Sequence, residues 1–150
     1  MVFEEKLHGV FPHTVTRPGN PLVRGFDEVF YVPHSRSAGV VRQDVEQVPE
    51  LRILAESEEA GLHLFGTDNG REIYVMGHLE YDKDTLYNEY RRDTDAGLSP
   101  PLPRHYFIDD DPEKGPLFRW RSHGHLMYSN WLNYYVYQET PFDLNELKGE

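Results

Sequence analysis

Short apolar runs separated by turn residues dominate the first half of the chain. Residues 7–11 and 29–32 are rich in Val and Phe and are bounded by Gly, Pro and Asn, which is typical of strands. The tripeptide Asp-Asn-Gly at 68–70 separates two further apolar runs. Asn and Gly tolerate the positive φ of tight turns. We therefore predict a hairpin at this point, with its second strand over residues 72–77.

The pattern then changes to one that is typical of a helix followed by a loop. A helix is predicted from about Asp84, a natural N-cap, to about Ala96, because Gly97 and Pro100 are the residue types that end helices. Pro and Asp crowd the segment 99–116, which predicts a long surface loop.

The last helix is predicted to begin near Ser122 and to end before Pro141. Its apolar residues form two adjacent ridges along one broad face, which we expect to pack into the core. The members of each ridge lie four residues apart: Met127, Trp131 and Tyr135, and beside them Tyr128, Leu132 and Val136. No internal repeat interrupts this order of elements, and the chain of 150 residues predicts a single α/β or α+β unit.

Composition excludes several classes of function. The chain has 26 acidic and 15 basic residues and a formal net charge of −11, so its average surface repels nucleic acid and anionic lipid. We expect no nucleic-acid partner and no membrane association. No cysteine is present, which excludes disulfides, thiolate metal sites and thiol catalysis by these residues. We expect a cytoplasmic protein.

His78-Leu79-Glu80 is the segment with the clearest chemical potential. It directly follows the predicted strand, and residues two apart on an extended segment point the same way. Glu80 can therefore orient His78 as a general base, as the third group of a catalytic triad does. The spacing alone is weak evidence, since His-x-Glu arises by chance in a chain with eight His, but its place at the end of a strand strengthens it.

Other polar clusters have simpler interpretations. His123 and His125 resemble a pair of metal ligands, but nothing nearby completes a set of three or four, so we predict no metal site. The remaining histidines lack a recognised metal-binding spacing: His8, His13, His34, His63 and His105. Two arginine pairs are suited to anion binding, yet a solvated surface is the simpler interpretation of each: Arg91 with Arg92, and Arg119 with Arg121.

Nine segments in a fixed order resemble one protein family. They are EKLHGVFPH, PLVRGFD, VPHSR, ELRILAESEEAG, GHLEYD, EYRRD, YFIDDDP, WRSHGHL and SNWLNYYVYQETPFDL, and they extend from about Glu4 to Leu144. The family is that of the homoserine O-succinyltransferases and O-acetyltransferases, which share the class I glutamine amidotransferase fold. The resemblance implies an α/β fold corresponding to the C-terminal half of a flavodoxin-like domain.

The resemblance also implies a mechanism and a set of site residues. A cysteine accepts the acyl group from acyl-CoA, and the hydroxyl of homoserine then attacks the thioester, as a step of methionine biosynthesis. His78 matches the general base of the family, and Glu80 matches the carboxylate that orients it. Lys6, Ser35 and Arg92 match positions that contact the substrate. Apart from acyl-CoA as co-substrate, no cofactor is implied.

The departures from the family pattern are also informative. Family members are about twice as long, and their cysteine precedes the EKL segment, in a portion without counterpart here. We therefore expect apolar surface that the remaining elements leave uncovered. Leu79 stands where the family commonly has Pro, and His125 where it often has Asn.

Several interpretations stay open at this point. The chain is a fragment, a subunit that needs a separate cysteine-bearing N-terminal half, or a non-catalytic homoserine-binding protein. A small metal-binding β-rich protein is the alternative from another class. We expect the chain alone to be inactive. The sequence does not decide between a succinyl and an acetyl donor, and it leaves open whether the protein forms a homo-oligomer.

Overall fold

The protein was analysed as a computed structural model, which describes residues 1–139. These residues form a five-stranded antiparallel sheet with the strand order β2-β1-β3-β4-β5. The strands are β1 (Val2–Val15), β2 (Val29–Ala38), β3 (Leu51–Ser57), β4 (Gly61–Thr67) and β5 (Ile73–Val75). The predicted strands 7–11 and 29–32 lie within β1 and β2, and the predicted strand 72–77 contains the shorter β5.

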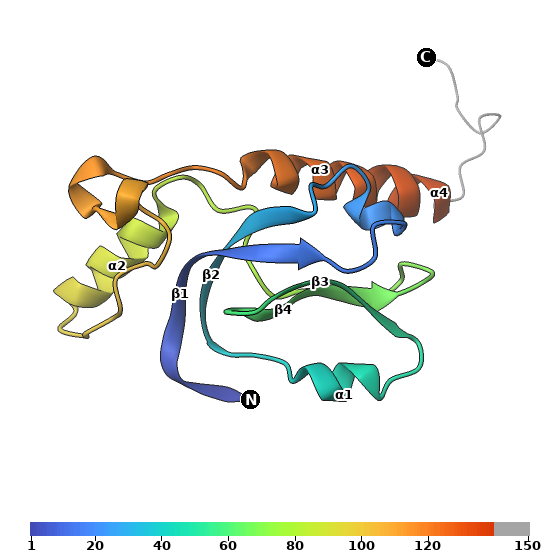
Figure 1. Cartoon of the computed structure of the whole chain (residues 1–150), viewed down its shortest axis with the longest axis horizontal. Coiled ribbons are helices and arrows are strands. Elements are labelled where there is room, and N and C mark those ends of the chain that lie inside the picture. The colour runs from blue at the N-terminus through green and yellow to red at the C-terminus, as the bar shows by residue number, and fades with distance from the viewer. Residues whose placement is uncertain (140–150) are drawn as a thin grey trace, which may run out of the picture.

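Helices lie on both sides of the sheet and beyond one of its ends. In Figure 1, α3 runs along one side, α1 lies on the opposite side, and α2 stands at the far left. Their bounds are α1 (Arg42–Glu46), α2 (Thr85–Asp95) and α3 (Arg121–Trp131); a π-helical turn (Leu132–Val136) and α4 (Tyr137–Glu139) continue α3. Short 3-10 turns occupy Pro21–Val23, Ile108–Asp110 and Pro112–Lys114. No helix among the described residues is long and apolar enough to span a membrane.

Two local predictions are confirmed closely. The turn at 68–70 joins β4 to β5, and Gly70 has the positive φ of 67° that such a turn requires. Helix α2 begins after Asp84, and Gly97, with φ of 77°, follows its C-terminal end. The Asp84 side chain accepts no hydrogen bond from the backbone N–H groups at the start of α2, so Asp84 holds the cap position without its usual contact.

The backbone of β1 pairs with a residue outside the sheet, which the sequence did not indicate. Residue 104 forms a parallel bridge to Gly9, and its backbone exchanges two hydrogen bonds with β1: Arg104 N donates to His8 O at 3.0 Å, and Val10 N donates to Arg104 O at 2.8 Å. A Cβ at Gly9 would lie 2.4 Å from the carbonyl oxygen of Arg104. The close approach of these two backbones therefore requires glycine at position 9.

The prediction of a surface loop over 99–116 is partly wrong. Tyr106 and Phe107 are buried in the main core, and the Tyr106 hydroxyl donates to Lys83 O at 2.5 Å. The many Pro and Asp residues predict irregular backbone correctly, but irregular backbone that pairs with β1 need not be exposed. This segment therefore closes the end of the core near α2.

The main core lies between the sheet and α3. Its buried members come from nearly every element: Val10, Leu22, Val23, Phe30, Val32, Leu54, Ala55, Leu64, Leu79, Leu86, Tyr106, Phe107, Trp120 and Met127. A smaller cluster of Val45, Leu62 and Phe65 lies on the other face, against α1.

The prediction that α3 buries both apolar ridges is wrong at three of the six positions. Met127 is buried, but Tyr128, Trp131 and Leu132 are each at least 40% exposed. The buried stripe of α3 consists instead of Gly124, Met127 and Asn130. The π-helical turn also shifts the phase of the following residues, so the spacing of four does not keep one face. The predicted end of this helix, at Pro141, lies outside the described residues.

Uncovered apolar surface adjoins α3, as the resemblance implied. Tyr74 and Val75 on the edge strand β5 are exposed, and a cavity of about 240 Å³ lies between this strand and α3. Its lining is almost wholly apolar: Leu22, Ile73, Val75, Met127, Tyr128 and Trp131. Strand β5 and α3 thus leave an apolar groove at this edge of the sheet.

Candidate active site

His78 lies in the turn that follows β5, where the chain leaves the sheet. His78 N donates to Pro33 O on β2 at 2.8 Å, and the next residue, Leu79, is buried against Gly124 of α3. A Cβ at Gly124 would lie 2.6 Å from Leu79 O, so the helix approaches the turn more closely than a larger residue would allow. Sheet and helix together fix the backbone on both sides of His78.

Glu80 forms the contact with His78 that the sequence predicts. His78 Nδ1 lies 2.8 Å from Glu80 Oε1. Because an ionised carboxylate only accepts hydrogen bonds, Nδ1 carries the hydrogen and Nε2 keeps a free lone pair. The His78 side chain is 36% exposed, so this nitrogen is available to a substrate. The geometry is that of a base held in one tautomer, and Leu79 in place of Pro does not prevent it.

Tyr81 supports the same imidazole from one face. Its ring stacks on the His78 ring with the centroids 4.4 Å apart and the planes 10° from parallel. The Tyr81 hydroxyl donates to Glu89 Oε1 at 2.9 Å, and burial, with this bond to Glu89, raises the pKa of Tyr81. Tyr81 therefore stays protonated near pH 7 and links His78 to α2.

Glu89 of α2 is the centre of the polar cluster. In addition to Tyr81, Ser35 Oγ of β2 donates to its Oε2 at 2.5 Å, and Lys6 Nζ of β1 lies 3.9 Å from the same oxygen. His8 Nε2, also on β1, is 3.9 Å from it. The Glu89 carboxylate, which is only 18% exposed, thus connects α2 to β1, to β2 and to the turn that contains Tyr81.

Arg92 and Asp93 extend this cluster along α2. Asp93 Oδ1 accepts from Arg92 Nε at 2.8 Å and from Nη2 at 2.6 Å, while Asp93 Oδ2 accepts from Lys6 Nζ at 3.3 Å. The bond from Arg92 lowers the pKa of Asp93. Arg92 is 68% exposed, and its charge acts on Tyr81 and Glu89. The substrate-binding role that the resemblance implies for Arg92 stays a prediction.

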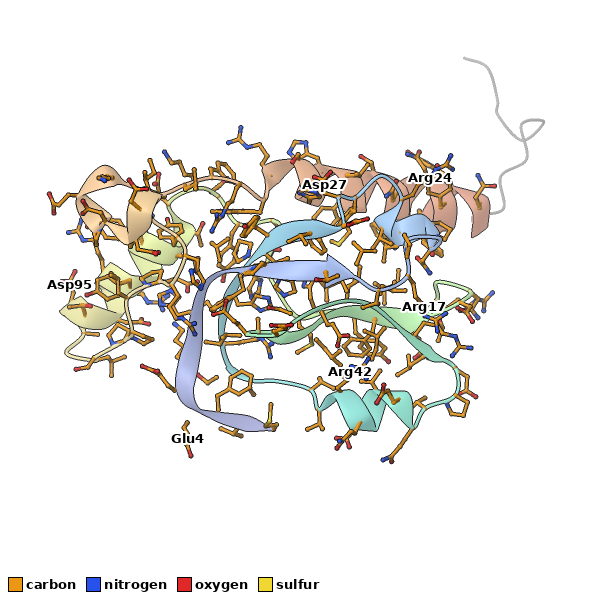
Figure 2. The ribbon with its side chains drawn as sticks, viewed as in Figure 1. Glu4, Arg17, Arg24, Asp27, Arg42 and Asp95 are labelled. Carbon is orange, nitrogen blue, oxygen red and sulfur yellow. The ribbon has the colours of Figure 1, made fainter. Side chains whose placement is uncertain are left out.

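The other sequence candidates lie away from this cluster. His123 Nε2 is 3.2 Å from Asp27 Oδ2, and His125 is exposed. Asp27 is labelled in Figure 2, on the loop before β2 beside α3. Arg119 lies over the Tyr31 ring at 3.7 Å, and Arg121 lies over Phe118 at 4.3 Å. Arg119 is half-buried and Arg121 is exposed, and each stacks on an aromatic ring.

Sequence reasoning missed two sets of residues. It gave Glu89 no place in the site, although its spacing of three from Arg92 places both on one helix face. It did not consider Tyr81, which directly follows Glu80. It also described the histidines as scattered, whereas nitrogens of His13, His34 and His63 lie within 4.8 Å of one another, the group of three potential metal ligands found among residues 1–139.

Comparison with known proteins connects this cluster to a family. The family model described as homoserine O-succinyltransferase matches residues 1–142. The chain belongs to this family. It is 56% identical over 145 residues to a homoserine O-acetyltransferase of Acetivibrio thermocellus, an alignment that covers 97% of this chain and 48% of the relative. A homoserine O-acetyltransferase of Bacteroides thetaiotaomicron is 52% identical over 145 residues, with the same two coverages.

The chain therefore spans about half the length of these curated relatives. Among solved structures, a glutamine amidotransferase from Thermotoga maritima superposes with a TM-score of 0.55 at 11% identity, covering 93% of this chain and 54% of that one. Likeness at this identity concerns the fold alone. It confirms the predicted fold class, a mixed α/β fold of the class I glutamine amidotransferase type.

Proposed function

We propose that these residues supply the general base and the homoserine site of a homoserine O-acyltransferase. The observation that carries the proposal is the 2.8 Å contact between His78 Nδ1 and Glu80, beside a polar cluster that contains Lys6, Ser35 and Arg92. Residues from two strands, one turn and one helix meet there. A solvated surface of unrelated side chains does not account for a base with a fixed tautomer next to them.

The chemistry proceeds in two acyl transfers. First, His78 Nε2 takes the proton of a cysteine thiol, the thiolate attacks the thioester carbonyl of acyl-CoA, and the CoA sulfur leaves with the proton that His78 returns. His78 then takes the proton of the homoserine hydroxyl, whose oxygen attacks the acyl-cysteine, and the cysteine sulfur leaves with the proton that His78 returns. Glu80 stabilises the imidazolium formed in each step. The 150 residues contain no cysteine, so the nucleophile comes from a cysteine-bearing N-terminal portion outside them.

The polar cluster matches the charges of an amino acid. The guanidinium of Arg92 is exposed and can hold a carboxylate by two parallel hydrogen bonds, in exchange for its present bonds to Asp93. Glu89 offers a negative charge for an ammonium group. Ser35 and Lys6 both lie next to that carboxylate and set its position. The substrate hydroxyl then extends toward His78.

The relatives favour one acyl donor. The family is described by succinyl transfer, whereas the relatives at 52–56% identity are named O-acetyltransferases. We therefore favour acetyl-CoA as the donor. Methionine biosynthesis in the cytoplasm is the setting that this activity implies.

The test is reconstitution of the activity from two chains. The purified chain is incubated with acetyl-CoA or succinyl-CoA and homoserine, and free CoA and acyl-homoserine are measured. We expect no turnover by the chain alone, because loss of the nucleophile from such a unit costs on the order of a million-fold. Turnover is expected after addition of the N-terminal half of the A. thermocellus relative. If the chain alone turns over and His78→Ala abolishes this, the assigned role of the cysteine is wrong.

Variants of the reconstituted enzyme test the individual roles. His78→Ala should lower kcat by roughly 100-fold to 10,000-fold, the usual contribution of a general base. Glu80→Gln should lower kcat by about 100-fold, since the neutral amide of Gln does not stabilise the imidazolium as the carboxylate does. His125→Ala, an exposed histidine outside the cluster, is the matched control and should retain full activity. Equal activity of the Glu80→Gln and His125→Ala enzymes would contradict the role of Glu80.

Homoserine binding by the chain alone separates a catalytic half from a non-catalytic binding protein. Calorimetry on the isolated chain should show homoserine binding that Arg92→Ala weakens by at least tenfold. Binding without any turnover in the reconstituted mixture would favour the non-catalytic interpretation.

A further inference from the structure

Three buried histidines lie together beneath the turn that carries His78. His13 of β1, His34 of β2 and His63 of β4 are each at most 1% exposed. The rings of His13 and His34 stack with centroids 5.0 Å apart, and their Nε2 atoms are 3.1 Å apart. Three imidazoles in one dry site resemble a metal centre, so the protonation of each nitrogen decides what the cluster does.

The hydrogens of His34 and His13 follow from their partners. Arg36 Nε, which only donates, lies 3.2 Å from His34 Nδ1, so this nitrogen accepts and the hydrogen of His34 is on Nε2. His34 Nε2 then donates to His13 Nε2 at 3.1 Å. His13 Nδ1 in turn donates to Phe11 O at 2.9 Å. The result is a directed chain of hydrogen bonds from Arg36 to the backbone of β1.

His63 is fixed in the same way by the backbone of the His78 turn. Gly77 N donates to His63 Nδ1 at 3.2 Å, so the hydrogen of His63 is on Nε2. That nitrogen is buried and has no partner among the described residues, an arrangement that costs stability. An apolar residue would avoid this cost but would leave Gly77 N without its acceptor.

These tautomers disfavour a metal ion. A neutral histidine that binds a metal through Nε2 carries its hydrogen on Nδ1. In His34 and His63 that hydrogen would point at the donors Arg36 Nε and Gly77 N. The guanidinium of Arg36 also repels a cation. Two of the three potential ligands are therefore held in the form that a metal ion cannot use.

The same contacts define the backbone just before His78. Met76 N donates to His63 O at 2.8 Å, and His78 N donates to Pro33 O at 2.8 Å. Between them, a Cβ at Gly77 would lie 2.8 Å from His34 Nε2, so the His34 ring packs directly on the bare α-carbon. The segment 76–78 is thus held by β4 on one side and by β2 on the other.

We propose that His63 and His34 are positioning residues for His78: the His63 ring holds Gly77 N, the His34 ring packs on the Gly77 α-carbon, and together they set where the His78 imidazole meets Glu80 and Tyr81. The proposal rests on the proposed function of His78 as the base. It extends the site inward, from the exposed dyad to a hydrogen-bonded network in the core.

Neutral rings are a condition of this arrangement. Burial lowers the pKa of both His34 and His63, and the charges of Arg36, His13 and His78 around them act in the same direction. Both rings therefore remain neutral near pH 7. Protonation of His63 Nδ1 would remove the only acceptor that the structure shows for Gly77 N.

The experiment compares two variants of nearly equal shape in the full 150-residue chain. His63→Asn places an amide oxygen near the position of Nδ1 and keeps an acceptor for Gly77 N, while His63→Leu has a similar size and offers none. We expect hydrogen exchange of the Gly77 amide to be at least tenfold faster in His63→Leu than in His63→Asn. The ring-current shift of the His78 protons by Tyr81 should be kept in His63→Asn and lost in His63→Leu.

Two further measurements distinguish this proposal from its rivals. Long-range ¹⁵N NMR of the unchanged chain should show the Nε2–H tautomer for His34 and His63 and the Nδ1–H tautomer for His13. An Nδ1–H tautomer at His63 would overturn the proposal, even if His63→Leu fails to fold. Stoichiometric Zn²⁺ binding to the chain that His13→Asn abolishes would overturn it in favour of a metal site.

Acyltransferase activity provides the last test. In the reconstituted enzyme, His63→Leu should lower kcat at least tenfold with the KM for homoserine unchanged, and His63→Asn should restore most of kcat. Unchanged kcat in His63→Leu would refute the positioning role. If no form of the enzyme transfers acyl groups, the proposed function fails, while the tautomers and the Tyr81 ring-current shift still decide whether His63 positions the turn.

Discussion

Acidification from pH 7 to pH 5 should destabilise the fold through the buried His13. Burial lowers the pKa of His13 from 6.5 to about 4, because the imidazolium would be desolvated among His34, His63 and Phe30. The unfolded chain, with an ordinary pKa, binds a proton below pH 6.5, while the folded chain does not do so until about pH 4. Stability is therefore complete above pH 6.5 and is lost as the pH falls.

The size of the effect follows from the same two values. At about 1.4 kcal/mol for each pH unit below 6.5, His13 alone lowers the free energy of unfolding by about 2 kcal/mol at pH 5 and by about 3 kcal/mol at pH 4, where the loss levels off. Burial lowers the pKa of His34 and His63 as well, so they add losses of the same sign. A loss of 2 kcal/mol is a large part of the stability of an ordinary domain.

Urea denaturation at pH 7 and pH 5 measures this loss, and a variant isolates His13. His13→Gln does not titrate, yet its amide oxygen can accept the hydrogen bond that His34 Nε2 donates to His13 Nε2. The unchanged chain should lose about 2 kcal/mol more than the variant between the two pH values, which corresponds to about 1 M in the urea midpoint. Equal losses in the two proteins, within about 0.5 kcal/mol, would refute the claim that folding excludes the charged form of His13.

Two further predictions concern packing. Gly9→Ala should lower the free energy of unfolding by about 1–3 kcal/mol, because the new Cβ would lie 2.4 Å from Arg104 O. Gly19→Ala is the control: its new Cβ would have no atom within 4 Å, so it should change this free energy by less than about 0.5 kcal/mol. Equal effects of the two variants in urea denaturation would contradict the close approach. Met127→Ala should cost about 2–5 kcal/mol because Met127 is buried. Trp131→Ala should cost clearly less in the same assay, since Trp131 is 41% exposed, and the reverse order would show that α3 buries the predicted ridge after all.

Interactions within a few residues along the chain could be predicted from the sequence. The Asp-Asn-Gly turn at 68–70 and the end of α2 at Gly97 depend on backbone conformations that only certain residues adopt. The contact between His78 and Glu80 is of the same kind, because only Leu79 separates them and one turn contains both. Family membership came from ordered local segments, and residue patterns alone gave the proposed catalytic role of His78 and Glu80 only weak support.

The face of α3 shows where such patterns stop being sufficient. Spacing identified apolar ridges, but burial depends on what packs against the helix, and the described residues provide only enough partners for the stripe of Gly124, Met127 and Asn130. Asn130 is buried because its side chain donates to Leu22 O and Arg24 O at 3.1 and 2.9 Å. Figure 2 shows Arg24 on the loop that lies against this helix. The spacing of residues within the helix gives no information about that loop.

By itself the sequence determined the hairpin, helix α2, the family and the local dyad, since each depends on neighbouring residues. Only the tertiary structure decided what surrounds the dyad. Pairing of β1 with β2 places His8 opposite Ser35 and Gly9 opposite His34, which sends one set of side chains toward Glu89 and the other toward the buried histidines. A shift of this register by one residue would exchange the two faces. Strand register and packing therefore assemble two separate clusters, one around Glu89 and one of the three histidines. Their members are far apart along the chain, where local sequence patterns carry no information.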